Sequence, residues 1–136
     1  MKNPDLSHVG LIVADLDKGV DFFQRLLDGP PLWIKDLPAV GLRLAEFRLG
    51  NTSIELLEVS KDGGGLGGKV MGRQPGLNHL ALTVADLDSS LEEFRAKGLK
   101  VMDGFPRQGA HGRVAFFEPE TTMDILLEIC QPEPED

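Results

Sequence analysis

Two histidines and two glutamates recur at equivalent places in the two halves of this 136-residue chain. His8 stands in "LSHVGLIVADLD" and His79 in "LNHLALTVADLD"; Glu55 follows His8 by 47 residues and Glu128 follows His79 by 49. Such a nitrogen–oxygen donor set suits Co, Ni, Mn, Fe or Zn and leaves about two octahedral positions for water or a bidentate substrate. The sequence therefore predicts one divalent metal ion, bound by all four side chains, that polarises a carbonyl.

The elements that must position these side chains are themselves repeated. Residues 6–23 match residues 77–94 at nine positions: Leu6, His8, Leu11, Val13, Ala14, Asp15, Leu16, Asp17 and Phe23. Each copy predicts a strand that leads into a helix, with three shorter strands behind it. In the first half these lie near 31–34, 41–49 and 52–59, with a Gly50–Asn51 hairpin turn; in the second they lie near 100–104, 112–117 and 123–130.

The predicted fold class is α+β, with two βαβββ repeats that pair into one incomplete curved barrel, because neither sheet alone covers its apolar face. We expect a single domain over residues 1–136, with halves of about 6–60 and 77–130 and a Gly-rich linker over 61–76. In each opening strand the histidine alternates with small or polar residues, so its face should line a cavity while the apolar face packs on the helix.

A structural interpretation of the four residues stays open beside the metal. A histidine on a strand is commonly a hydrogen-bonded structural residue, and duplication alone can preserve it in both copies. A buried unpaired carboxylate is costly, however, whereas a divalent cation compensates two carboxylates at once. The recurrence of both members of both pairs favours the metal.

Composition limits the partners and the compartment. The net charge of -8 opposes phosphate backbones and anionic lipids, so no nucleic acid and no membrane is expected as a partner. The sequence shows neither a signal peptide nor a membrane-spanning run, which favours a cytoplasmic protein. Cys130 is the single cysteine and is expected to be a small buried thiol.

The double βαβββ pattern, with His, Glu, His and Glu on its outer strands, resembles the vicinal oxygen chelate superfamily, which includes glyoxalase I, extradiol dioxygenases, bleomycin-resistance proteins and methylmalonyl-CoA epimerase. The stretches "HVGLIVADLDKGVDFFQRLLDG" and "LGNTSIELLEV" carry this likeness. The stretch "GAHGRVAFFEPETTMDILLEI" favours the epimerase subgroup.

The resemblance implies a metal at His8, Glu55, His79 and Glu128, and an isomerase that acts on a 2-substituted malonyl-CoA such as methylmalonyl-CoA. Abstraction of the C2 proton would give an enolate held on the metal, with Glu128 as metal ligand and catalytic base. It also implies an acyl-CoA or other thioester as the small-molecule partner, and a homodimer.

One departure from the epimerase pattern keeps other functions open. The second glutamate of the family usually lies in a "P-E-x-G" context, where this chain has "PAVG" with Ala39. Glu46 is expected to be a solvated strand residue rather than its replacement. A glyoxalase I-like lactoylglutathione lyase, which returns the proton to the same or a neighbouring carbon, is therefore an alternative. A non-catalytic drug- or metabolite-binding protein is the other.

The remaining candidate features have weaker functional interpretations. The linker contains Gly63, Gly65 and Gly68 in the spacing of a dinucleotide-binding loop, but no adequate helix is expected before Pro75, so a mobile crossover is favoured. His111 stands in a glycine turn, as either an exposed residue or a substrate contact.

Overall fold

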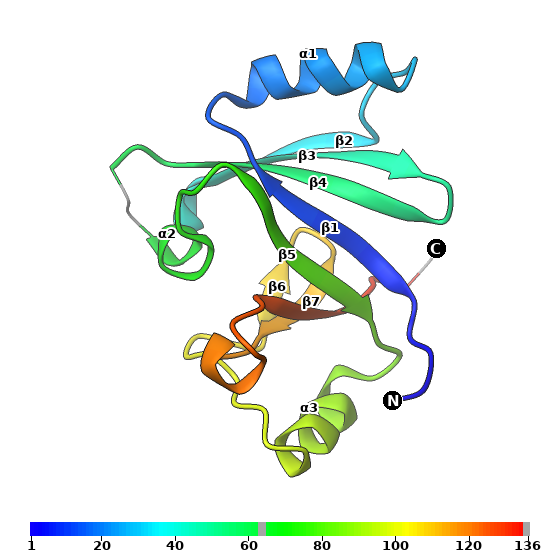
Figure 1. Ribbon diagram of the computed structural model, residues 1–136, viewed down its shortest axis with the longest axis vertical. Helices are drawn as coiled ribbons and strands as arrows, with labels where there is room; N and C mark the ends of the chain where they lie inside the picture. The colour runs from blue at the N-terminus through cyan, green and yellow to red at the C-terminus, as the bar shows by residue number, and fades with distance from the viewer. Residues whose placement is uncertain (63–64, 135–136) are drawn as a thin grey trace. The chain divides into compact units, whose positions relative to one another are not determined.

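The two halves of the chain fold as separate compact units. In the computed structural model, which describes residues 1–62 and 65–134, one unit comprises His8–Asn78 and the other joins Met1–Ser7 to His79–Asp136. Each half contains the predicted βαβββ series, with short 3-10 turns added (Figure 1). Whether the two halves act as a single domain stays a prediction.

The first half consists of β1 (Leu6–Ile12), α1 (Leu16–Leu26), β2 (Trp33–Leu37), the 3-10 turn η1 (Pro38–Val40), β3 (Leu42–Leu49) and β4 (Thr52–Val59). The strands lie in the order β2-β3-β4-β1. Strands β3 and β4 form the hairpin predicted at Gly50–Asn51, with Leu49 opposite Thr52. Strand β1 pairs with β4 in parallel, which places Gly10 beside Glu55.

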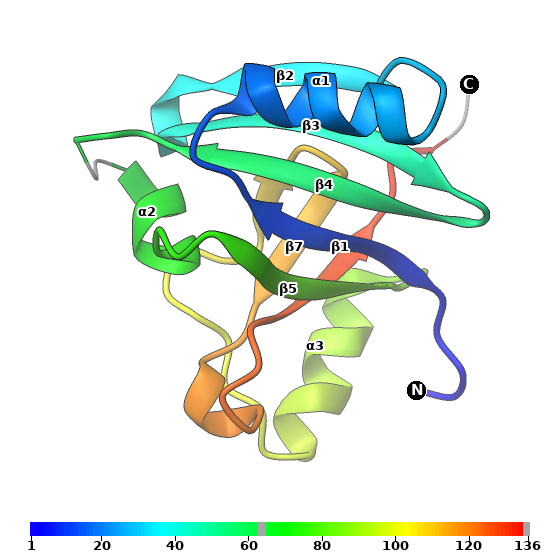
Figure 2. The ribbon, with the colours of Figure 1, turned by 45° about the horizontal axis from the view of Figure 1, so that its top comes forward.

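Helix α1 covers one face of this sheet, where it packs against β3 and β4 (Figure 2). The Asp15 side chain accepts a hydrogen bond from the Lys18 amide and so caps the first turn, as its position before the apolar stripe predicts. The core on this face consists of buried Leu16, Ala45, Phe47 and Leu56, with Leu11, Val13, Val20, Phe23, Leu27 and Ile54 packed around it. The apolar face of β1 therefore packs on the helix, as predicted.

The second half repeats this arrangement with β5 (Gly76–Thr83), α3 (Leu87–Ala96), β6 (Arg107–Gly109), β7 (Gly112–Phe116), the 3-10 turn η2 (Pro119–Thr121) and β8 (Leu127–Gln131). The strand order is β5-β8-β7-β6, and β5 pairs with β8 in parallel. Helix α3 is capped by Asp86 and buries a stripe of Leu87, Leu91 and Phe94 against Ala115, Phe117 and Ile129. Its end is a Schellman motif, in which the Leu99 amide donates to the Phe94 carbonyl.

Two strands of the second half differ from the prediction. Within the expected strand at 100–104, only Val101 forms a β-bridge, to Phe117. The pairing with β7 begins later, at Arg107. Before that point Gly104 turns the chain with φ +91, and Pro106 lacks a backbone N–H donor. Strand β8 begins at Leu127 rather than near 123, because Met123 and Asp124 both adopt positive φ.

The crossover between the halves contains a helix that the sequence interpretation missed. Helix α2 (Gly65–Met71) has seven residues, and glycine lets it lie directly against η1: a Cβ on Gly67 would lie 2.5 Å from the Val40 oxygen. The sequence suggested that the glycines make this segment mobile. In the structure, glycine instead allows α2 to pack closely against η1. Gly63, the first glycine of the predicted dinucleotide pattern, lies outside the described residues.

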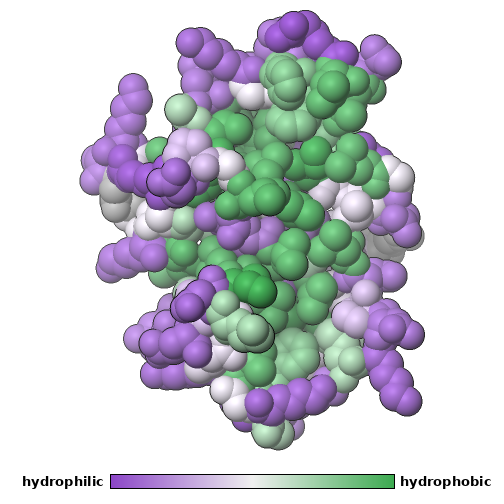
Figure 3. Space-filling view, in the orientation of Figure 1, coloured by the Kyte–Doolittle hydropathy of each residue, from purple (hydrophilic) through white to green (hydrophobic). Residues whose placement is uncertain are grey.

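The flank of α1 leaves apolar side chains in solvent. Phe22 and Leu26, one helical turn apart, are 51% and 58% exposed. Figure 3 shows apolar surface over this helix beside its charged residues. A flank of this kind is suited to protein contact, but the homodimer stays a prediction. Among residues 1–62 and 65–134, no helix is long and apolar enough to cross a membrane.

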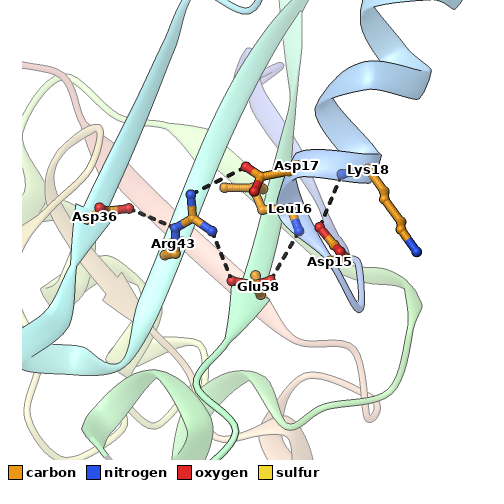
Figure 4. A network of polar contacts seen from close by, with 7 residues as sticks. All are labelled: Asp15, Leu16, Asp17, Lys18, Asp36, Arg43 and Glu58. Atoms are coloured by element: carbon orange, nitrogen blue, oxygen red, sulfur yellow. Dashed lines mark hydrogen bonds and ion pairs between the residues drawn. The ribbon is translucent and has the colours of Figure 1, made fainter.

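Arg43 ties three elements of the first half together (Figure 4). Its guanidinium contacts Asp36 of β2 at 3.0 Å, Glu58 of β4 at 3.4 Å and Asp17 of α1 at 3.5 Å. Glu58 in turn accepts a hydrogen bond from the Leu16 amide at the start of α1. The hydrogen bond to Asp36 is the main reason why the pKa of Arg43 is raised above its ordinary value. The guanidinium is therefore charged at every pH at which the protein is studied.

We expect Arg43→Met to lower the free energy of unfolding by about 1–2 kcal/mol, because three carboxylates lose their shared cation while the apolar stem is kept. Urea denaturation at low salt measures this, and the loss should shrink in about 1 M salt. Arg25→Met is the control: its pair with Asp21 is 72% exposed on both sides and its removal should matter by less than about 0.5 kcal/mol. Equal losses in the two variants would contradict the network.

Candidate metal centre

The first pair of predicted ligands lies on the face of its sheet opposite α1. His8 is fully buried, Glu55 is 3% exposed, and His8 Nε2 lies 3.8 Å from Glu55 Oε2. The parallel register of β1 on β4 brings His8 and Glu55 together. Gly10 lies opposite Glu55 and has no side chain, and His8 lies two residues before Gly10 on the same face of the sheet. The histidine face is thus buried and separate from the helix face, as the alternation predicts.

The second pair repeats this construction within the other unit. His79 and Glu128 are each 4% exposed, and His79 Nε2 lies 3.1 Å from Glu128 Oε1. Here Ala81 stands opposite Glu128 in the β5–β8 register, where the first half has glycine. A small residue at the position beside each glutamate leaves room for the histidine of the same strand. The two halves therefore place a buried imidazole beside a buried carboxylate by the same means.

The surroundings of the two pairs differ. The residue opposite Glu128 on β7 is Phe116, whose ring meets the His79 ring at 5.5 Å and 76° and also packs on Phe105. The residue opposite Glu55 on β3 is Glu46, with Trp33 beyond it on β2. The second pair therefore lies against an aromatic wall, and the first pair lies beside another carboxylate.

The expectation that Glu46 is a solvated strand residue is wrong. Glu46 is only 8% exposed, because β3 lies between β2 and β4 and its Glu46 face is the face of Glu55. The alternation in "LRLAEFRL" carried this signal, since Leu42 and Leu44 share its face. Sequence reasoning also missed the edge-to-face contact of the His79 and Phe116 rings, which depends on the pairing of β7 with β8.

Three further residues singled out in the sequence are not among the four predicted metal ligands. Ala39 is exposed in η1, so the described chain has an apolar side chain where the epimerase pattern has its second glutamate. Cys130 is a buried thiol, as predicted, and it donates to the carbonyl oxygen of His111 at 3.4 Å. His111 stands in the turn between β6 and β7, and a substrate contact there stays a prediction.

The chemistry of the two pairs fits a divalent cation. Each pair offers one imidazole nitrogen and one carboxylate in a buried setting, where an ionised carboxylate needs a compensating charge. Histidine and carboxylate are ordinary ligands of first-row divalent metals. The alternative, that each pair is only a structural hydrogen bond, explains each pair separately. It does not explain why both halves bury a carboxylate beside a histidine, although burying a carboxylate is costly.

Comparison of the sequence with models of known protein families identifies the family of this chain. The model of the Glyoxalase/Bleomycin resistance protein/Dioxygenase superfamily matches residues 5–128, nearly the whole chain. The chain belongs to this superfamily. Both the predicted resemblance and the predicted fold class of two βαβββ repeats are therefore confirmed.

Relatives within the superfamily include proteins named for one activity. The chain is 27% identical over 128 residues to the mitochondrial methylmalonyl-CoA epimerase of Homo sapiens, covering 93% of this chain and 73% of that protein. It is also 27% identical to the uncharacterized protein YqjC of Bacillus subtilis, covering 93% and 91%. The crystal structure of methylmalonyl-CoA epimerase from Mycobacterium tuberculosis superposes with a TM-score of 0.82 at 26% identity, covering 95% of this chain and 88% of that one.

Proposed function

We propose that the protein is a metal-dependent epimerase of a 2-substituted malonyl-CoA, of the methylmalonyl-CoA type. The observation that carries this proposal is the pair of buried histidine–glutamate contacts, one in each half of a superfamily member whose relatives include methylmalonyl-CoA epimerases. The proposed metal ligands are His8, Glu55, His79 and Glu128. A bound divalent ion would supply charge compensation for negative oxygens of the substrate.

Glu128 is the proposed base of the reaction. Its ionised carboxylate takes the C2 proton, the C–H bond breaks, and the electron pair moves into the thioester carbonyl. The burial of Glu128 between Ala81 and Phe116 keeps bulk water away from the carboxylate, so that the carboxylate acts on the substrate. The aromatic wall of Phe116 and Phe105 also restricts the orientation of the His79 ring.

Two measurements on the purified protein test the proposal. We expect about one divalent metal ion per chain by mass spectrometry, and deuterium at C2 when methylmalonyl-CoA is incubated with the protein in D₂O. Protein stripped by chelator should lose both the exchange and some thermal stability, and regain both when the metal returns, because a ligand that binds only the folded state stabilises it. Stability gives a result that does not depend on turnover.

The lyase alternative has one observation in its favour, the exposed Ala39 in place of a second glutamate. Metal without C2 exchange, together with lactoylglutathione formed from the hemithioacetal of methylglyoxal and glutathione, would transfer the assignment to a lyase. Failure to bind Co, Ni, Mn, Fe or Zn after reconstitution would remove the metal centre and leave a binding protein.

A further inference from the structure

The edge strand of the second half carries a cation on the same face of the sheet as Glu128. Cys130, two residues after Glu128, lies opposite Val114 in the β7–β8 register, and Val114 lies opposite Arg107 in the β6–β7 register. Residues directly opposite each other in an antiparallel pair point to the same face of the sheet. The exposed Arg107 side chain therefore leaves β6 on the face of the metal pair, at the outer edge of that face.

Two contacts hold the strand in this orientation. Phe105, two residues before Arg107, packs its ring on Phe116 with the ring centroids 5.3 Å apart. Gln108, the next residue after the cation, alternates to the other face of the sheet, where its side-chain amide donates to the Glu133 carboxylate. The direction in which Arg107 points is thus fixed by its neighbours on both sides.

The Arg107 guanidinium is unpaired within the described part of the chain. Among residues 1–62 and 65–134, no side chain forms a hydrogen bond or an ion pair with it. The chain has 22 acidic and 14 basic residues, and other exposed arginines are paired, Arg25 with Asp21 and Arg113 with Asp88. An unpaired guanidinium on the face of the metal pair is available to an anionic ligand.

The first half, taken by itself, has a cation at the corresponding position. Lys35 of β2 lies two strands away from Leu57, and Leu57 follows Glu55 by two residues. Arg107 has the same relation to the residue that follows Glu128 by two. In each half an aromatic residue precedes the cation by two positions. A charge on an edge strand also discourages aggregation, but a carboxylate would serve that purpose equally well, so the recurrence of a positive charge points to a negatively charged ligand.

We propose that Arg107 binds a phosphate of the CoA portion of the substrate, a role that rests on the proposed epimerase function. The α-carbons of Arg107 and Glu128 are separated by two strand spacings and two residues along the strand, which is roughly 12 Å. The guanidinium therefore lies away from the reacting carbon, toward the edge of the sheet, and does not touch the reacting atoms.

The chemistry of CoA supplies the matching anion. The thioester is joined to the phosphates by the flexible pantetheine arm, and the phosphate that ends this arm is the nearest one to the thioester. That phosphate is the one assigned to Arg107, because the planar guanidinium donates two parallel hydrogen bonds to phosphate oxygens. Arg107 is thus a specificity residue, which selects a phosphorylated thioester over one without phosphate.

The experiment uses Arg107→Met, which removes the charge and keeps an apolar stem. C2 exchange in D₂O is measured with the methylmalonyl thioesters of CoA, of phosphopantetheine, which keeps only the phosphate that ends the arm, and of pantetheine, which has none. We expect kcat/KM to fall by about 10-fold or more for the first two thioesters, mainly through KM, and to change by less than about two-fold for the third.

The matched control is Arg95→Met, which removes a charge from an exposed position of α3 and should leave all three thioesters unaffected. Arg107→Lys keeps the charge without the paired donors and should keep part of the preference. Calorimetric titration with CoA and with pantetheine gives a result that does not depend on turnover. Wild-type protein should bind CoA more tightly, and the difference should shrink in Arg107→Met and in about 1 M salt.

Three results overturn the proposal. The first is an equal loss for all three thioesters in Arg107→Met, because it assigns Arg107 a structural role. The second is a loss for the CoA thioester alone, because the phosphate that ends the arm is then not the ligand. The third needs no variant and applies even if Arg107→Met does not fold: wild-type protein that uses the CoA and pantetheine thioesters equally well has no phosphate site, although its C2 exchange keeps the epimerase function. Wild-type protein that exchanges none of the three refutes the epimerase function itself, and the role of Arg107 falls with it.

Discussion

Glu128→Gln is expected to lower C2 proton exchange by at least about 100-fold even at saturating metal, because an amide cannot take the proton. Glu128 is proposed to be both ligand and base, so its removal has two separable effects. The first is weaker metal binding, measured by titration of the stripped protein. The second is loss of exchange that added metal does not restore.

Glu55→Gln is the matched comparison, since Glu55 occupies the equivalent strand position in the other half and is proposed to be a ligand only. An amide oxygen still coordinates a metal, though more weakly than a carboxylate. We therefore expect Glu55→Gln to need more metal and then to recover most of its exchange. Recovery of both variants to the same level would show that Glu128 is not the base.

Gly112→Ala should give the largest loss of stability among the single-methyl substitutions considered. Gly112 adopts φ +115, and a Cβ there would lie 2.2 Å from the carbonyl oxygen of Gln131 on the neighbouring strand. The backbone of β8 would have to move away from β7. We expect the free energy of unfolding to fall by at least about 2 kcal/mol and the melting temperature by about 5 °C or more.

Gly29→Ala is the control for that substitution. No atom lies within 4 Å of a Cβ built on Gly29, and its φ lies outside the left-handed range. Its effect on stability should be within about 0.5 kcal/mol, with a small gain possible from the stiffer unfolded chain. Both variants are compared by calorimetry. Equal melting temperatures for the Gly112→Ala and Gly29→Ala proteins would show that β7 and β8 can move apart without loss of stability.

The sequence was most informative where periodicity and repetition act together. The nine identities between residues 6–23 and 77–94 predicted both strand–helix units, and the Asp15 and Asp86 caps start the helices where expected. The hairpin turn at Gly50–Asn51 also fixes the register of β3 on β4, and counting back from it pairs Glu46 with Glu55. The burial of Glu46 was therefore within reach of the sequence.

Other features depend on contacts that no local pattern contains. Asp28 takes the left-handed position after α1, where glycine is the commoner residue, because the helix ends at Leu26 and aspartate tolerates that conformation. Helix α2 contains three glycines, which weaken its helix signal, and it is held by its packing on η1. The 3.1 Å contact of His79 with Glu128 follows from the β5–β8 register, which pairs residues 47 apart in the chain, such as Ala81 and Glu128.

The membership of Met1–Ser7 in the unit of the second half has a consequence for protein synthesis. The Thr83 amide donates to the Asp5 carbonyl at 2.9 Å, and the Met1 amino group pairs with the Glu93 carboxylate, 92 residues away. A ribosome that adds about 5–20 residues per second needs about 5–18 s to make that interval. Residues 8–78 emerge complete during this time. Residues 1–7 are thus made before residues 8–78 but reach their native neighbours only after residues 79–93 have been made.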